Sequence, residues 1–290
     1  MSKTWLAERV YGQYADCAAG AQSGFSRRSL LTVLAGAGAS VAGPIAIRRS
    51  FAAPEAAASF LARVTAVDGS DRLRLADGRR VILPHILGPD RDRPMPPPTD
   101  GDRHRAAQAL ADRVLGREVR IDLAEPGQDR YGRLRARVIC DGEDMAEWQC
   151  RAGTVRVFPE PGAAEDRIAE LLRAEDAART AAAGHWADGR FSVRLVNGDP
   201  MDDEQEAATD RFDIALGTIR RVTPIGGRLH LEFGEDWRTD FTVGLEPRAE
   251  RSLPVAREFL PGRVIEARGW VRFWNGPYME VAEAVCIRLR

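Results

Sequence analysis

Alternating apolar and polar positions predict a small antiparallel β-meander within residues 62–90. Leu73 and Leu75 alternate with arginines, which is the period of a strand with one buried face. The pair Asp77-Gly78 follows, and it supplies the positive backbone angles that a tight hairpin turn requires. A further apolar strand leads from this turn into a proline-containing loop. The pattern therefore predicts three consecutive strands that end where a functional site can form.

A second strongly marked strand lies at residues 129–139, with the sequence DRYGRLRARVI. Residues 119–123 alternate in the same way ahead of it, and the intervening EPGQ predicts a turn between the two strands. Together with the meander, these strands make five. Five strands with helices packed on them predict a barrel of the oligonucleotide-binding (OB) type.

Three helices are predicted around this barrel from apolar positions at helical spacing. The first spans Arg103–Leu115, the second is a short helix that Gly153 ends, and the third spans Ala163–Ala183. His104 and His185 are interpreted as residues on helix surfaces. The first region is therefore mainly β with helices packed against it.

The C-terminal region is nearly all strand and predicts a second OB-like barrel of five strands. A short helix is expected near Pro254–Phe259, and an acidic segment precedes the first strand. The predicted strands are Phe212–Val222, Arg228–Phe233, Asp240–Leu245, Arg263–Phe273 and Tyr278–Leu289.

The N-terminal segment resembles a twin-arginine export signal. Arg27 and Arg28 precede a weakly hydrophobic run, and small residues follow at the expected cleavage point. A periplasmic or secreted protein is therefore expected, with no stable membrane insertion after signal cleavage; an uncleaved anchor is the alternative. The predicted organisation is residues 1–52 extension and signal, 53–60 linker, 61–192 first barrel, 193–210 acidic linker and 211–290 second barrel.

The composition is that of a globular chain, with 44% hydrophobic and 29% charged residues. The formal net charge of −1 argues against a uniformly basic surface, so that affinity for a polyanion requires a local basic face. The four cysteines lack C-x-x-C or zinc-ligand spacing, and the four histidines do not complete such a site. Buried free thiols are expected.

The combination of VDG, LRLADGRRV and DRYGR, in that order, resembles the thermonuclease family of staphylococcal-nuclease-like OB-fold enzymes over roughly residues 60 to 190. This resemblance implies hydrolysis of phosphodiester bonds with calcium as cofactor. In the family, two aspartates, one glutamate and two arginines hold the metal and stabilise the charge that develops on the phosphoryl group.

Two of the positions implied by the resemblance have lost their chemistry. The first metal-binding aspartate corresponds to Asp71, with Asp68 in the same turn, and both also suit a turn-forming role. The first arginine of the family falls on Ile82, and the second metal-binding aspartate falls on Leu87. A calcium site, if one is retained, therefore has an incomplete ligand set.

Two other catalytic positions of the family are retained in altered form. Its glutamate corresponds to Asp90, which is one methylene shorter, and its second arginine is Arg133, with Tyr131 beside it. Arg133 is the best candidate for contacting an anion, although an ion pair with Asp129 fits the same sequence.

Candidate ligand-binding residues lie in both predicted barrels. Arg72 and Arg74 belong to a basic hairpin that either follows a phosphate backbone or forms a solvated strand face. Trp237 and Trp274 lie in predicted turns of the second barrel, where they offer stacking surfaces. The segments LEFGEDWRTDFTV and ARGWVRFWNGPYMEV resemble a module appended to some exported bacterial thermonuclease-like proteins.

These observations predict an exported thermonuclease-like protein with a degraded phosphodiesterase centre, which binds nucleic acid or another extended polyanion. Two alternatives remain open. One is an active calcium-dependent nuclease with a rearranged site, and the other is a cell-envelope module that binds a protein or a glycan.

Overall fold

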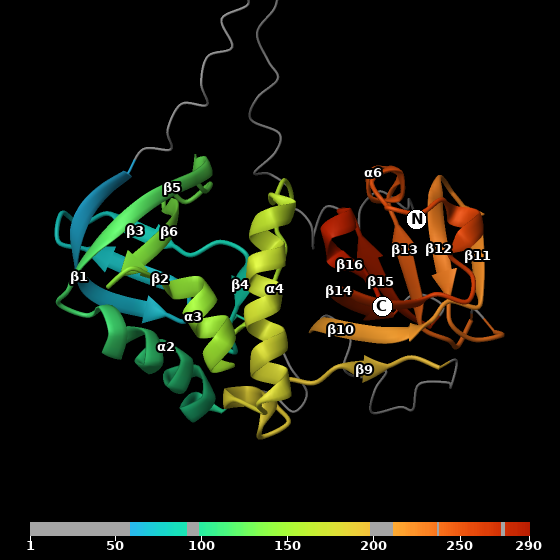
Figure 1. The fold of residues 1–290 in the computed structure, drawn as a ribbon, viewed down its shortest axis with the longest axis horizontal. Coiled ribbons are helices and arrows are strands. Elements are labelled where there is room, and N and C mark those ends of the chain that lie inside the picture. The colour runs from blue at the N-terminus through green and yellow to red at the C-terminus, as the bar shows by residue number, and fades with distance from the viewer. Residues whose placement is uncertain (1–58, 92–98, 198–210, 237, 274–275) are drawn as a thin grey trace, which may run out of the picture. The chain divides into compact units, whose positions relative to one another are not determined.

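The structure is a computed structural model that describes residues 59–91, 99–197, 211–236, 238–273 and 276–290 (Figure 1). Residues Ser59–Arg290 form one compact unit. The predicted export signal lies outside the described residues, as do Trp237 and Trp274. No helix among the described residues is long and apolar enough to cross a membrane.

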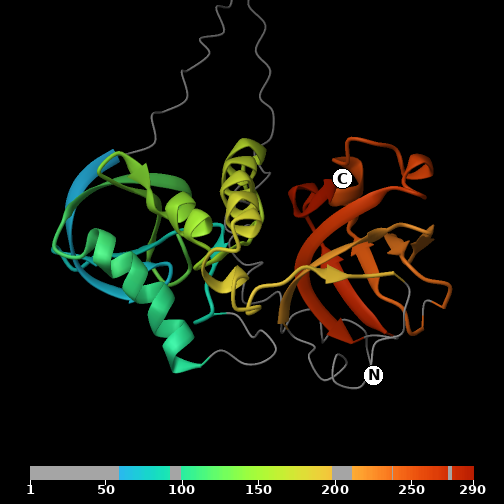
Figure 2. The same cartoon turned by 60° about the horizontal axis from the view of Figure 1, so that its bottom comes forward.

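The first barrel is closed, and its strand order is that of an OB fold (Figures 1 and 2). The order is β3-β2-β1-β5-β6, and a parallel pairing between β3 and β6 closes the ring. The other pairings among these five strands are antiparallel. The strands are β1 Ser59–Gly69, β2 Arg72–Leu75, β3 Arg80–Ile82, β5 Glu118–Gln128 and β6 Leu134–Cys140.

The β2–β3 hairpin forms where the local sequence predicts it. Leu73 and Leu75 are buried inside the barrel, while Arg74 between them is exposed. Gly78 has φ +85° in the turn, a conformation that L-residues with side chains rarely adopt. The meander is therefore determined by side-chain alternation and one glycine.

The β5–β6 connection differs from the predicted one. Residues 125–128 were expected to form the turn, but β5 continues through them to Gln128, with an irregular register against β6 after Leu123. The turn itself lies at residues 129–133, where the backbone N–H of Asp129 donates to the carbonyl of Arg133. The Asp129 carboxylate accepts backbone N–H groups within this turn, and this moves the chain reversal past the proline.

Three helices accompany the first barrel. The first, α2 (Asp100–Val114), begins three residues earlier than predicted because Thr99 and Asp102 form a reciprocal capping box. The second, α3 (Met145–Ala152), ends at Gly153 as predicted. The third, α4 (Glu165–Thr180), lies within its predicted range. The remaining short elements are β4 Ile86–Leu87, β7 Glu143–Asp144, β8 Arg156–Val157 and η3 Gly184–Trp186.

The second barrel has the same OB order. The sheet runs β11-β12-β13-β15-β14-β10, where β13 and β15 are parallel, and β10 and β11 follow one another as two halves of a first strand. The prediction of two OB-like barrels in a mainly β chain with helices is confirmed. The strands are β9 Arg194–Leu195, β10 Arg211–Thr218, β11 Arg221–Ile225, β12 Arg228–Glu232, β13 Thr242–Leu245, β14 Val264–Phe273, β15 Pro277–Val281 and β16 Ile287–Leu289.

Two details of the second barrel differ from the prediction. Its α-helix is α6 (Pro247–Arg251), directly after β13, and only the 3-10 turn η4 (Arg257–Phe259) falls at the expected place. The predicted last strand is divided into β15 and β16 by the 3-10 turn η5 (Ala284–Cys286). The sequence is apolar through this turn, apart from Glu283, so it gave no signal of the break.

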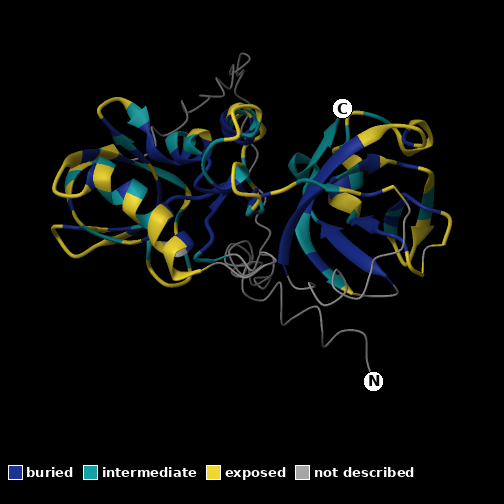
Figure 3. Ribbon diagram, turned by 90° about the horizontal axis from the view of Figure 1, so that it is seen from below, coloured by how far each residue is buried: buried dark blue, intermediate teal, exposed yellow. Residues whose placement is uncertain are grey.

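Each barrel has its own hydrophobic core. One cluster of buried residues includes Leu73, Ile121 and Val138, and the other includes Leu231, Val243 and Ile265. Figure 3 shows buried strands in both barrels. The three cysteines among the described residues are free thiols, and Cys140 and Cys150 are buried as expected. Burial raises the pKa of the Cys150 thiol well above its usual value, so this thiol stays protonated.

A buried ion network joins α4 and β8 to β14. Arg268 is 1% exposed and donates to Glu175 at 3.0 Å, to Glu266 at 2.7 Å and to the carbonyl of Val157 at 3.0 Å. Arg179 bridges the same two glutamates. Burial raises the pKa of Glu266, but the guanidinium groups of Arg268 and Arg179 outweigh it and hold that pKa well below its usual range.

Candidate functional site

In an OB fold, ligands bind over strands 2 and 3 and the loops that connect strands 1–2 and 4–5. In the first barrel these loops are the β1–β2 turn and the β5–β6 turn. All site residues predicted in this barrel lie on β2, in these two turns, at the end of β1 or in the segment after β4. The fold therefore places them where an OB barrel binds its ligand.

Asp71 in the β1–β2 turn is completely buried and is paired with Arg91. A second guanidinium lies close, because Arg72 Nε is 3.4 Å from Asp71 Oδ1. Burial is the largest influence and raises the pKa of Asp71, while Arg91 and Arg72 oppose it. The carboxylate that the resemblance assigns to the metal therefore already has cationic partners.

Asp90 accepts hydrogen bonds from Ser70 Oγ and from the Arg72 guanidinium, so both of its carboxylate oxygens are used. A Cβ atom at Gly88 would overlap the Ser70 side chain, and one at Gly69 would overlap Arg72 and Asp90. These two glycines permit the close approach of the turn to the segment after β4. The structure thus brings Asp71, Asp90 and Arg72 together, in a cluster closed by arginine.

The two positions at which the resemblance implies an arginine and an aspartate carry buried apolar side chains. Leu87 is 0% exposed and Ile82 is 5% exposed. Arg135 on β6 lies in register beside Ile82, but it pairs with Glu160 at 2.5 Å and is itself buried. The nearby His85 is buried as well, and burial, with help from Arg135 and Arg167, lowers its pKa to about 3. Neither Arg135 nor His85 replaces the missing groups.

These residues do not fit a calcium ion. Calcium takes six to eight oxygen ligands, several of them carboxylate oxygens. Here Asp71 is bound by Arg91, Asp90 is bound by Ser70 and Arg72, and Leu87 has no oxygen in its side chain. Two guanidinium groups supply the positive charge that a cation would otherwise provide.

Asp68 and Arg74 form a separate ion pair at 3.1 Å, with both side chains exposed to solvent. Such surface pairs contribute little to stability, about 0–1 kcal/mol. Asp68 is therefore not part of the buried carboxylate cluster, and Arg74 is neutralised on its strand face.

The β5–β6 turn presents an aromatic ring between cations. Arg133 Nε donates to Asp129 at 2.6 Å, which is the ion pair that the sequence left open. Tyr131 is 56% exposed, and the guanidinium carbons of Arg130 and Arg133 lie 4.8 and 5.1 Å from its ring centroid. Arg80 donates to the Tyr131 carbonyl at 3.2 Å. We name Arg80, Arg130, Tyr131 and Arg133 the turn cluster.

The hairpin arginines differ in how far they are neutralised. Arg72, Arg74 and Arg79 each pair with an aspartate. Arg80 makes no ion pair with a described residue, and its hydrogen bond is to a carbonyl. Much of the basic strand face predicted from the sequence is therefore compensated by aspartates.

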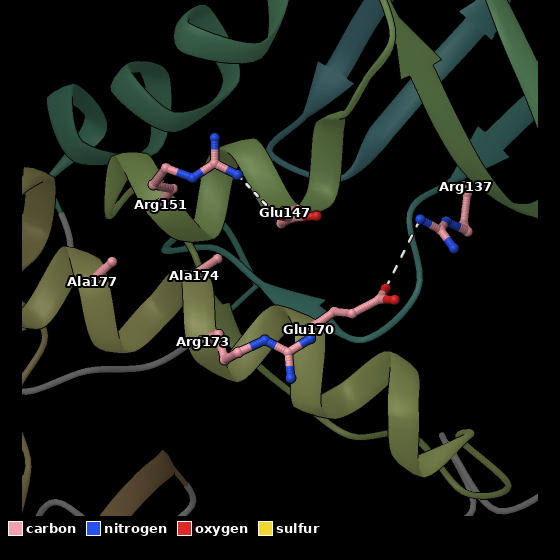
Figure 4. Close-up of a pocket in the computed structure, with 7 residues that line it drawn as sticks. All are labelled: Arg137, Glu147, Arg151, Glu170, Arg173, Ala174 and Ala177. Carbon is pink, nitrogen blue, oxygen red and sulfur yellow. Dashed lines mark hydrogen bonds and ion pairs between the residues drawn. The ribbon is translucent and has the colours of Figure 1, made fainter.

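A polar groove of about 400 Å³ lies between α3 and α4 (Figure 4). Glu147 pairs with Arg151 at 2.7 Å, and Glu170 lies 3.9 Å from Arg137 across the groove. Arg173 is exposed and has no ion-pair partner within the described part of the chain. The groove is thus lined mainly by charges that already neutralise each other.

Most of the residues that gather at the ligand face of the first barrel were predicted from the sequence. Arg91, Ser70 and Arg135 were not. Arg91 follows Asp90 directly in the chain, yet nothing in the sequence indicates that it pairs with Asp71, 20 residues earlier. Trp237 and Trp274, the predicted stacking residues of the second barrel, remain predictions because they lie outside the described residues.

The described geometry defines a protein with two OB-like barrels, and the predicted site residues of the first barrel gather at its ligand face. Residues 97–188 match the family of staphylococcal nuclease homologues, so the chain contains a domain of this family, and the predicted resemblance is confirmed. The matched segment includes the turn cluster residues from 130 to 133 but begins after Asp71 and Asp90. No curated protein matches the chain.

Proposed function

We propose that the first barrel binds single-stranded nucleic acid without hydrolysing it, and that the turn cluster is the contact surface. The observation that carries this proposal is the exposed Tyr131 ring between Arg130 and Arg133. Bases stack on such rings whatever their sequence, and arginines follow the phosphate backbone. The position on the β5–β6 turn agrees with the ligand face of OB folds.

We further propose that the phosphodiesterase centre is degraded. An arginine that meets the charge of a transferring phosphoryl group contributes roughly three to five decades in rate in well-studied cases. Ile82 and Leu87 supply neither charge nor metal ligand, and the remaining carboxylates are paired with arginines. The expected outcome is binding of the polyanion with no efficient chemistry, and no calcium requirement.

Export remains part of this proposal through the twin-arginine-type signal at residues 1–52. A periplasmic or secreted location suits a binding protein for extracellular nucleic acid. The Arg27-Arg28 pair supports this location, and fractionation of cells that produce the full chain, with and without substitution of both arginines by lysine, tests it.

Replacing Tyr131 by alanine is expected to weaken binding of a fluorescent single-stranded oligonucleotide by about tenfold, since base stacking contributes about 1–3 kcal/mol per base. Replacing Arg80 by alanine is expected to reduce the slope of log affinity against log salt by about 1. Fluorescence anisotropy over a salt series measures both effects. Arg63→Ala, an exposed arginine of β1 outside the turn cluster, is the control. Equal affinities for Tyr131→Ala and wild type would contradict the proposed contact surface.

Incubation of the full chain with single-stranded DNA and millimolar calcium is expected to give no cleavage above background. Arg133→Ala is expected to behave in the same way, since Arg133 is held by Asp129. Gel electrophoresis, with an active calcium-dependent nuclease as positive control, makes the measurement. Cleavage that depends on both calcium and Arg133 would establish the alternative of a working nuclease. Absence of oligonucleotide binding together with absence of cleavage favours the cell-envelope module that binds a protein or a glycan.

A further inference from the structure

A buried histidine outside the candidate site has unused hydrogen-bonding capacity. The sequence suggested that His185 lies on a helix surface, but its ring is 0% exposed in η3, where it packs against Phe191. Neither Nδ1 nor Nε2 has a hydrogen-bond partner within the described part of the chain. Burying a polar group without a partner costs free energy, so the surroundings of this ring need an explanation.

Two carboxylates lie beside this ring. Asp102, at the start of α2, and Asp188, after η3, each place an oxygen so that all three side chains have donor atoms within 4.8 Å of one another. His185 Nδ1 is 3.7 Å from Asp188 Oδ2. This separation is too long for a hydrogen bond. It is close to the distance between two ligand atoms of a tetrahedral zinc ion, which is about 3.4 Å when each metal–ligand bond is about 2.1 Å.

We propose that Asp102, His185 and Asp188 bind one divalent transition-metal ion of the zinc type. Imidazole nitrogen with carboxylate oxygen is a donor set that suits zinc and its neighbours, whereas calcium and magnesium prefer oxygen alone. Three protein ligands leave one coordination position open. The site is separate from the Asp71 cluster, which lies in the β1–β2 turn.

The carboxylates are already oriented by other contacts, as metal ligands usually are. Thr99 N–H and Oγ1 donate to Asp102 Oδ2, and Arg190 also contacts this oxygen. Asp102 Oδ1 lies 3.7 Å from the Arg105 guanidinium. The backbone N–H of Arg190 donates to Asp188 Oδ1. Asp188 Oδ2, which lies 3.7 Å from His185 Nδ1, accepts a hydrogen bond from Arg105 at 3.1 Å.

Arg105 competes with the metal for this position. Its guanidinium lies 3.1 Å from Asp188 Oδ2 and 3.7 Å from Asp102. The Arg105 side chain is 55% exposed, so it is able to move into solvent when the ion enters. Replacing Arg105 by alanine is therefore expected to strengthen metal binding, which a purely structural role of the cluster does not predict.

The test is titration of the full chain with zinc and with cobalt(II), followed by calorimetry and by the visible spectrum of bound cobalt. We expect one equivalent bound, a cobalt spectrum without a thiolate charge-transfer band, and a rise in Tm with zinc. Asp188→Asn keeps the shape of this exposed side chain and is expected to weaken zinc binding at least about tenfold. His185→Gln is expected to weaken zinc binding to a similar extent. Arg105→Ala is expected to tighten it.

His104→Ala, an exposed histidine on the same helix α2, is the matched control and is expected to bind as wild type does. Zinc binding that survives unchanged in Asp188→Asn and His185→Gln, or that shows the thiolate band, would place the metal on other residues and overturn the proposal. Absence of binding to a wild-type chain with a normal thermal transition would overturn it as well.

Discussion

Arg268→Ala is expected to lower the free energy of unfolding by about 3–5 kcal/mol, which is the usual cost of removing one partner from a buried ion pair. Glu175 and Glu266 are 0% and 2% exposed, and both lose a guanidinium in this variant. The carbonyl of Val157 loses its side-chain donor as well. Urea unfolding followed by circular dichroism measures the change. Arg263→Ala, an exposed arginine of the same barrel, is expected to change stability by less than about 0.5 kcal/mol.

The pH dependence of this effect follows from Glu266. Its pKa in the folded protein is below the usual 4.5, so its pairing stabilises the fold above that value and the contribution is lost as pH falls toward the folded pKa. The difference between wild type and Arg268→Ala is therefore expected to shrink on acidification below about pH 4.5. A difference that stays constant from neutral to acidic pH would show that lost packing, and not the unpaired carboxylates, causes the loss.

Arg91→Ala is expected to cost about 3 kcal/mol or more, because it leaves the completely buried Asp71 carboxylate with Arg72 Nε alone, at 3.4 Å. Arg74→Ala breaks the exposed pair with Asp68 and is the matched control, with an expected cost of about 1 kcal/mol or less. Thermal and urea unfolding of both variants provide the comparison. Equal losses in the two variants would mean that Arg91 does not neutralise a buried charge.

A second substitution separates charge from packing at this position. Burial raises the pKa of Asp71, so the carboxyl is more easily protonated in the folded protein, and stability associated with it falls as pH rises through that pKa. The loss in Arg91→Ala is therefore expected to be larger at neutral than at mildly acidic pH. Adding Asp71→Asn to Arg91→Ala is expected to recover part of the stability at neutral pH.

Arg91 and Arg72 pair with Asp71 and Asp90, and for this reason we propose that the two carboxylates do not hold a metal ion. In Asp71 and Asp90 the chain keeps two acidic groups at the ligand face of the first barrel, and both are neutralised from within the protein. Arg80 of the turn cluster, by contrast, makes no ion pair with a described residue. In the function that we propose, binding of an anion at this face is separate from the chemistry that the family resemblance implies there.

The turns and strands of the first barrel were predictable because their signals are local. The alternation of Leu73 and Leu75 with arginines distinguishes the buried face of β2 from its outer face. Gly78 adopts the positive φ angle that the hairpin turn requires. The sequence also shows apolar side chains at Ile82 and Leu87, where the family resemblance implies an arginine and an aspartate.

The predictions that were wrong concern segments in which another interaction overrides the local sequence signal. The EPGQ segment has turn composition, but β5 continues through it because the Asp129 carboxylate forms the turn further on. The helix α2 starts before its apolar periodicity begins, because a capping box holds its first residues. His185 was expected on a helix surface, but it is buried in η3 and packs against Phe191, a contact that the local sequence does not indicate.

By itself, the sequence determined the strand pattern, the two barrels and the family resemblance of the first barrel. Only the tertiary structure decided which charges meet: Arg91 with Asp71, Arg268 with Glu175, and the buried His185 with two aspartates. The physical reason is that hydrophobic alternation acts between near neighbours in the chain, whereas charged side chains pair with whatever the folded barrel brings within a few ångströms.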